Sequence, residues 1–150
     1  MVSVNELVNE LKTLTTSVSE FTDKGFSIYS MEEIEALSGH VQLPLVGVVY
    51  NGAEKVQNSA DGVSRQKTAA FVTAYFTVVV AMSYRYLTDG DTKVDAIDLL
   101  DQLRATILGY QGANTRPWLF NGEQPLGSDS EGVIYYGQTW ETSLPMLSNN

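Results

Sequence analysis

The stretch that decides the fold is Ala74-Tyr75-Phe76-Thr77-Val78-Val79-Val80-Ala81-Met82-Ser83-Tyr84-Arg85-Tyr86. Every second side chain, beginning with Ala74 and Phe76, is apolar or aromatic and mostly large. The positions between them are smaller or more polar, with Thr77 and Ser83 among them. A period of two with one heavy apolar face predicts a strand whose sheet is covered by helices on that side.

Two amphipathic helices are predicted, one before this strand in the sequence and one after it. The first begins at Ser3, which forms a capping box with Glu6, and continues to about Phe21 along one apolar stripe. The second runs from Thr92 to about Leu108, and Gly109 suits its C-terminal cap. Its apolar side is formed by Ala96, Leu99, Leu100, Leu103 and Ile107. We expect Val78, Val80 and Met82 to pack against that side.

A short strand over residues 26–29 and a two-turn helix are predicted between these elements. Ser30 and Glu33 have the spacing of a second capping box at the start of that helix. Tyr29 and Ile34 occupy the two positions of a hydrophobic staple around the box. The next strand is expected over residues 43–50, and it ends at the turn signal of residues 51–52.

The remaining chain is interpreted as loops and one aromatic strand. A long polar loop is expected at about residues 51–68, and a second loop from Trp118 to Gly127. The final strand alternates Ile134, Tyr136 and Trp140 with smaller side chains, and it continues to residue 144. The order α-β-α-β-β-α-β predicts a single α+β domain over residues 1–150, with a mixed, mainly antiparallel sheet and helices packed on one face.

Composition limits the classes of function. The chain has 150 residues, no cysteine and a net charge of −9, with 43% hydrophobic residues. Without cysteine it has neither disulfides nor thiolate metal sites, and its acidic balance opposes nonspecific binding to nucleic acid. An acidic surface also keeps a protein soluble, so two roles of the negative charge stay open: repulsion of DNA and solubility. The longest apolar run, Ala69 to Met82, is 14 residues, whereas a membrane helix needs about 20.

The residues that could carry chemistry do not form a recognisable site. His40 is the one histidine, and no nucleophile is tied to it by a known spacing. Asp89-Gly90-Asp91 lacks the further oxygen ligands of a calcium loop, so we interpret it as a turn. Asp95, Asp98 and Asp101 lie three apart, and a solvated helix face is favoured over a divalent-ion site. We therefore predict no enzymatic activity, no cofactor and no metal.

Other side chains are candidates for contacts with protein partners. The polar loop carries Lys55, Arg65 and Lys67, so it is locally basic on an acidic protein. Asp95 and Asp98 could form part of a subunit contact on the second long helix. Aromatic residues concentrate in the last 35 residues, where core packing is the ordinary interpretation and interface contact the alternative. Trp118 is our interface candidate among them.

One family shares this succession of elements. The strand of residues 74–85, the helix from Asp91, the loop Trp118-Leu119-Phe120-Asn121-Gly122-Glu123-Gln124-Pro125-Leu126-Gly127 and the strand Val133-Ile134-Tyr135-Tyr136-Gly137-Gln138-Thr139-Trp140 follow one another. Over roughly residues 41–144 this pattern resembles the tail terminator, or tail completion, proteins of long-tailed bacteriophages. The long polar segment at 51–68 and the acidic balance depart from the family pattern.

The resemblance implies a structural virion protein rather than an enzyme. Such proteins are expected to form a hexameric ring at the head-proximal end of the tail tube, where they stop tube growth and join the tail to the head connector. The implied partners are the tail tube protein, the head–tail connector protein and, in a contractile tail, the sheath protein. DNA would pass through the lumen without specific binding, and no membrane is involved. The protein would be assembled in the host cytoplasm and reside in the tail or neck of the virion.

Two other classes of protein stay open on the residues alone. One is an acidic, dimeric secretion chaperone with an apolar groove for an extended partner, or another non-enzymatic binding module. The other is a hydrolase or ligand-binding domain whose site the sequence does not reveal. A gene neighbourhood of capsid and tail genes would favour the tail protein over both.

Overall fold

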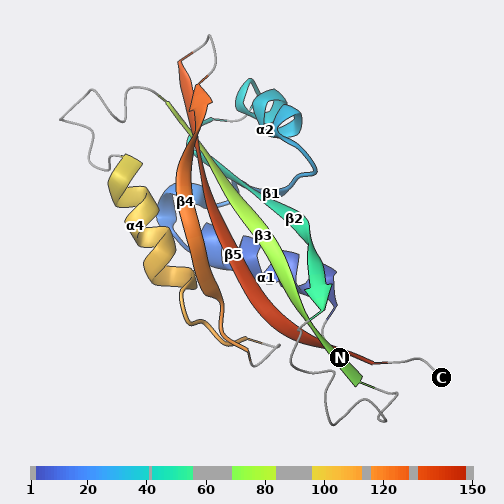
Figure 1. Cartoon of the computed structure of the whole chain (residues 1–150). Coiled ribbons are helices and arrows are strands. Elements are labelled where there is room, and N and C mark those ends of the chain that lie inside the picture. The colour runs from blue at the N-terminus through green and yellow to red at the C-terminus, as the bar shows by residue number, and fades with distance from the viewer. Residues whose placement is uncertain are drawn as a thin grey trace.

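The computed structural model describes residues 3–40, 42–55, 69–83, 96–112, 116–128 and 132–147. Its elements in chain order are α1 (Val4–Thr16), the 3-10 turn η1 (Ser19–Phe21), β1 (Gly25–Ser27), α2 (Met31–Ser38), β2 (Leu45–Lys55), β3 (Ala69–Ser83), α4 (Ala96–Ile107), β4 (Leu119–Ser128) and β5 (Val133–Leu147). Figure 1 shows the long strands as one twisted sheet with helices packed against it.

The sheet has five strands in the order β1-β2-β3-β5-β4. β1 pairs parallel to β2, and all other neighbours are antiparallel. β3 and β5 form the centre, paired without a break from Ala69↔Leu147 to Ser83↔Val133. The predicted α+β fold with a mixed, mainly antiparallel sheet is therefore confirmed.

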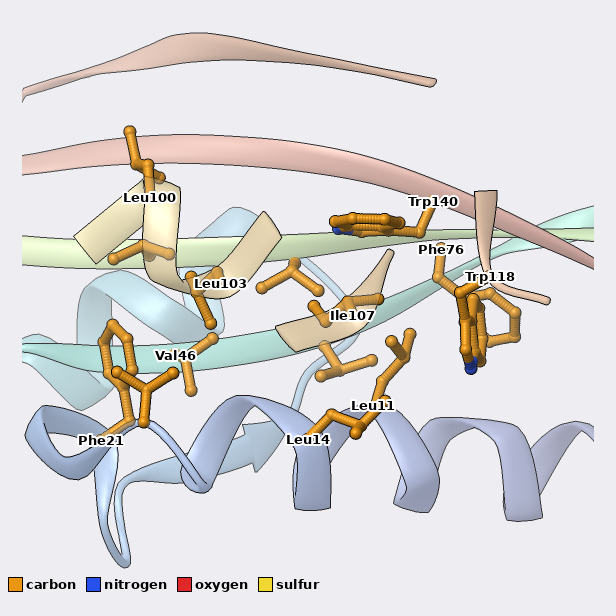
Figure 2. Close-up of a cluster of buried hydrophobic side chains, with 14 of the residues drawn as sticks. Leu11, Leu14, Phe21, Val46, Phe76, Leu100, Leu103, Ile107, Trp118 and Trp140 are labelled. Carbon is orange, nitrogen blue, oxygen red and sulfur yellow. The ribbon is translucent and has the colours of Figure 1, made fainter. Parts of the chain in front are cut away.

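One face of the sheet is covered by α1 and α4, and this helix-covered face holds the main core. Every second residue of β3, from Ala74 to Met82, is buried there, as the alternation predicted. The expected packing of Val78, Val80 and Met82 against α4 is confirmed, because these residues share one cluster with Leu99, Leu100, Leu103 and Ile107. Figure 2 shows side chains from α1, α4 and the strands converging in this cluster, among them Leu11, Leu14, Val46, Leu103, Ile107 and Trp140.

The opposite face carries a second, smaller core under α2. This α2 cluster consists of Ile28, Ile34, Leu45, Val79, Ala81, Val133 and Tyr135. One detail of the prediction therefore differs, because α2 lies on the face opposite to α1 and α4 (Figure 1). The reason is its place in the chain: α2 is the crossover between the parallel strands β1 and β2, and such a helix packs on a sheet face.

Of the two predicted capping boxes, the first is confirmed and the second is wrong. At α1, the Ser3 hydroxyl accepts from the Glu6 amide at 3.1 Å, and the Glu6 carboxylate accepts from the Ser3 amide. At α2, the Ser30 side chain forms no capping hydrogen bond among the described residues, and Glu33 instead accepts from the backbone amide of Tyr29 at 3.0 Å. The Tyr29 side chain is 89% exposed, so the predicted staple is also wrong.

Several element bounds differ from those expected from the sequence. α1 ends at Thr16 rather than near Phe21, because Val18 adopts an extended conformation before the 3-10 turn; Phe21 is still buried in the main core. β2 continues through the expected turn of residues 51–52 as a bulge, and Gly52 supplies the positive φ of 105°. Only residues 56–68 of the expected loop lie outside the described residues, since β2 extends to Lys55.

The largest correction concerns the loop expected from Trp118 to Gly127. Residues 119–128 form β4, an edge strand paired with β5. Its Gly and Pro residues suggested a loop, but the strand contains two bulges, between Phe120 and Gly122 and between Pro125 and Gly127. Proline and bulges are tolerated at a sheet edge, where one side of the strand needs no partner.

The prediction that Gly109 caps the C-terminal end of α4 is confirmed. Gly109 follows α4 with φ of 77°, a conformation that glycine adopts at low cost, and its amide donates to the Trp118 carbonyl at 2.9 Å. In the described part of the chain α4 begins at Ala96, and the expected start at Thr92 lies outside the described residues.

Candidate functional surfaces

Among the described residues, no three His, Cys, Asp or Glu side chains gather closely enough to hold a metal ion. His40 is exposed just beyond the end of α2, as expected of a loop histidine. None of the helices in these ranges is long and apolar enough to cross a membrane.

The predicted interface residues fall into three groups: two that are exposed, three that lie outside the described residues, and Trp118, which is buried. Lys55 is exposed at the last position of β2, and Asp98 is exposed on α4. Arg65, Lys67 and Asp95 lie outside the described residues. The structure therefore places Lys55 and Asp98 on surfaces that a partner can reach.

Trp118 lies inside the subunit, which corrects its expected place at an interface. Its side chain is 1% exposed, and its ring meets Phe76 edge-on at 5.3 Å between centroids. Its indole N–H donates to a carboxylate oxygen of Glu10 on α1 at 2.8 Å. Figure 2 shows Trp118 beside Phe76 at one end of the main core. Trp118 therefore anchors the start of β4 to α1, because apolar contact and the hydrogen bond are both satisfied within the chain.

A polar network joins α4 to the edge strand. The Arg104 guanidinium forms ion pairs with Asp101 on the same helix and with Glu123 on β4. Glu123 also accepts from the buried amide of Gln138 on β5 at 2.8 Å, and that amide donates to the Leu100 carbonyl at 3.0 Å. These contacts hold β4 against α4, so the free side of β4 is presented in a defined position.

Beyond α2, no described helix covers the second face of the sheet, and polar side chains lie on it. Thr73, Tyr75 and Thr77 of β3 are half-buried there. The Tyr75 hydroxyl donates to Glu54 at 3.3 Å, and the Asn51 amide donates to the Thr77 hydroxyl at 2.5 Å. Desolvation raises the pKa of the Tyr75 phenol above its ordinary value of 10.0, and the carboxylate of Glu54 raises it further. This open face is the half-solvated surface that the strand alternation predicted.

A row of four aromatic side chains crosses the helix-covered face at one level of the sheet. The register aligns Phe120 of β4 with Trp140 of β5, Trp140 with Phe76 of β3, and Phe76 with Tyr50 of β2. Neighbouring rings touch at both ends, with centroids 5.2 Å apart for Phe120 and Trp140 and 5.4 Å for Tyr50 and Phe76. We call these four residues the aromatic row.

The two ends of the aromatic row are exposed while its middle is buried. Phe120 is 38% exposed and Tyr50 is 42% exposed, whereas Trp140 and Phe76 are fully buried. Sequence reasoning missed this arrangement, because Phe120 was placed in a loop and Tyr50 at the end of a strand. The alternation of Tyr50 with Val48 and of Phe120 with Trp118 was the available signal.

A small apolar hollow lies beside Tyr50 at the β1–β2 side of the sheet. It has a volume of about 220 Å³. Apolar and aromatic side chains from α1, from the two residues after β1 and from β2 form most of its wall, and they are Val4, Val8, Ile28, Tyr29, Val48 and Tyr50. We call it the edge groove. It adjoins one exposed end of the aromatic row.

Comparison with known proteins identifies the family. No curated protein matches the chain. The family model described as the phage tail terminator protein matches residues 12–150, which is all but the first 11 of the 150 residues. The match includes every described strand and α4, and it extends beyond the segment on which the resemblance was based. The chain therefore belongs to the phage tail terminator protein family, and it is a structural, non-enzymatic protein of the virion tail.

Proposed function

We propose that this protein forms a homohexameric ring on the last ring of the tail tube, stops tube growth and presents a surface to the head–tail connector protein. The family match over residues 12–150 is the observation that carries the proposal. Contact with a tail tube protein follows from that family; the hexamer, the connector and a sheath protein in a contractile tail are the further steps proposed here. The secretion chaperone and the hidden hydrolase lose their support, because neither belongs to this family.

The surface chemistry of the subunit is compatible with a ring through which DNA passes. Each subunit has a net charge of −9, so six subunits around a channel would repel DNA and discourage it from adhering to the wall. The open face of the sheet carries hydroxyl and carboxylate groups, among them Thr77 and Glu54, rather than a cationic surface. These features favour passage of DNA without specific binding.

We also propose that basic residues after β2 contact a neighbouring subunit or a tail protein. Lys55 is exposed at the end of that strand, and Arg65 and Lys67 follow in the same polar stretch of sequence. Reversing the charge of all three should weaken tail completion while the subunit stays folded. Charge reversal of Lys24, a half-buried lysine near β1, is the matched control. Normal tail completion by the triple variant would count against this contact.

Images of assembled tails test the ring itself. Tails completed in the presence of the protein should show a six-fold ring at the head-proximal end, and labelled protein should lie in that ring. Tails made without the protein should vary in length and fail to join heads. A neck that lacks a six-fold ring of this protein, or tubes of normal length in its absence, would refute the proposal.

A further inference from the structure

We propose that neighbouring copies in the ring meet head to tail across the two edges of the sheet, with Phe120 of one copy packed on Tyr50 and the edge groove of the next. This inference rests on the proposed ring and names the surfaces that close it. A ring of identical subunits needs two different, complementary surfaces on each copy, since a self-complementary patch produces a closed dimer instead. The aromatic row ends in two such surfaces.

The register of the sheet places these two surfaces at the same level. Phe120, Trp140, Phe76 and Tyr50 are successive partners across four strands, so the two exposed rings lie at opposite edges of one transverse row. A second copy placed beside the first in the same orientation brings Phe120 next to Tyr50. The ring contacts within each subunit would then continue across the boundary, in the tilted and edge-on geometries that aromatic pairs prefer.

Both sheet edges are open at that level in the described part of the chain. β1 pairs with β2 only up to Ser27↔Val48, so β2 forms the edge from Tyr50 onward. β4 is the last strand at the other edge. β2 and β4 run in opposite directions, because three successive antiparallel pairings separate them. Two copies in the same orientation therefore meet with antiparallel edges, a favourable arrangement for strands that approach each other.

Side chains rather than a continuous backbone ladder should carry the contact. Pro125 and two bulges interrupt β4, and these features oppose open-ended pairing of edge strands. Apolar side chains are available for contact at this edge. Leu108 and Tyr110, which follow α4, are exposed near the start of β4, together with Phe120. The edge groove, about 220 Å³ in volume, presents apolar walls to them on the neighbouring copy.

Cysteine cross-linking in assembled tails tests the pairing directly, because the chain has no cysteine of its own. Tails completed with an equal mixture of Tyr50→Cys and Phe120→Cys subunits should give a covalent dimer with a short thiol-specific cross-linker. Tails completed with a chain that carries both substitutions should give a ladder up to the closed ring. Each single variant alone should give no dimer. Ile97→Cys, on an exposed apolar residue of α4, replaces Phe120→Cys in the control mixture and should not cross-link.

The outcomes separate this inference from the proposed function. A six-fold ring in the tail without the Tyr50–Phe120 dimer overturns the inference and leaves the ring intact. A dimer formed by Phe120→Cys alone also overturns it, because the contact would then be self-complementary. Tails without a ring of this protein overturn both proposals.

Discussion

The two faces of the sheet are built from alternate residues of the same strands, yet they differ in what covers them. On the helix-covered face, Phe76, Val78 and Val80 lie beneath α1 and α4 in one large core. On the other face, Val79 and Ala81 lie in the small α2 cluster, and beyond it Tyr75 is only half-buried. Neighbouring residues of one strand therefore face either a closed core or a face that the described helices leave uncovered and available for contacts.

The comparison indicates where stability and assembly are located. Hydrophobic burial scales with the apolar area removed from water, so the larger cluster should contribute most of the folding free energy. The open face has polar side chains that already bond to one another, so single substitutions there should leave the fold intact. Each of the following experiments tests this division.

The largest effect is expected from truncation within the main core. Leu103→Ala on α4 removes a fully buried side chain and should destabilise the domain by roughly 2–5 kcal/mol. That loss is large against a total stability of typically about 5–15 kcal/mol. Denaturant unfolding followed by circular dichroism measures it. Leu100→Ala, which removes a side chain 3% exposed, should have a cost in the same range.

The matched control lies on the same helix. Ile97 is 64% exposed on α4, and Ile97→Ala should change the free energy of unfolding by roughly 0.5 kcal/mol or less. If Ile97→Ala destabilised the domain more than Leu103→Ala, the orientation of α4 described here would be incorrect.

A smaller effect is expected from the α2 cluster. Ile34→Val removes one methylene from a fully buried side chain, and it should cost roughly 0.5–1.5 kcal/mol. Ala36→Ser, on the exposed side of α2, is the control and should change stability by roughly 0.5 kcal/mol or less. A null result for Ile34→Val would mean that α2 is not held against the sheet in solution.

The sequence alone predicted the helix-covered face well and the sheet edges poorly, for a physical reason. Alternation from Ala74 to Met82 and the apolar stripe of α4 both report burial within one chain, so they identified the core correctly. The side of the sheet that α2 covers depends on the parallel pairing of β1 with β2, which no local pattern records. Sequence therefore identified which residues are buried more reliably than which elements bury them.

The candidate surfaces were harder to predict because residues that are typical of turns also occur at bulges within strands. Asn51-Gly52 and the Gly and Pro residues of 119–128 are typical of loops, yet here they form bulges within edge strands. The same ambiguity applies to aromatic residues. Trp118 was an interface candidate and lies in the core, whereas Phe120, two residues further along, is exposed at an edge. Only the pairing of strands across the sheet distinguishes a buried aromatic residue such as Trp118 from an exposed one such as Phe120.

On the open face, Tyr75 should affect stability at alkaline pH. Desolvation and the nearby carboxylates of Glu54 and Glu141 raise the pKa of the Tyr75 phenol in the folded state. The unfolded chain then loses this proton at a lower pH than the folded chain does. The contribution of Tyr75 to stability is therefore complete below pH 10 and falls as the pH rises through the folded pKa.

Tyr75→Phe removes that titration and serves as the test. The stability of the variant should fall less steeply than that of the natural chain as the pH rises above 10, measured by urea unfolding at a series of pH values. Identical slopes for Tyr75→Phe and the natural chain would show that the carboxylates do not act on Tyr75 in solution.

The smallest effect on folding is expected at Asp98, an exposed carboxylate on α4. Asp98→Asn keeps the size of the side chain and removes its charge, so the free energy of unfolding should change by roughly 0.5 kcal/mol or less. Because Asp98 is also an interface candidate, unfolding should be measured beside a tail-assembly assay. A folded variant that fails to complete tails would place Asp98 at a contact between proteins, whereas a variant that unfolds would show that the charge supports the helix itself. Normal folding together with normal tail completion would confine the assembly surfaces to the sheet edges and the basic segment after β2.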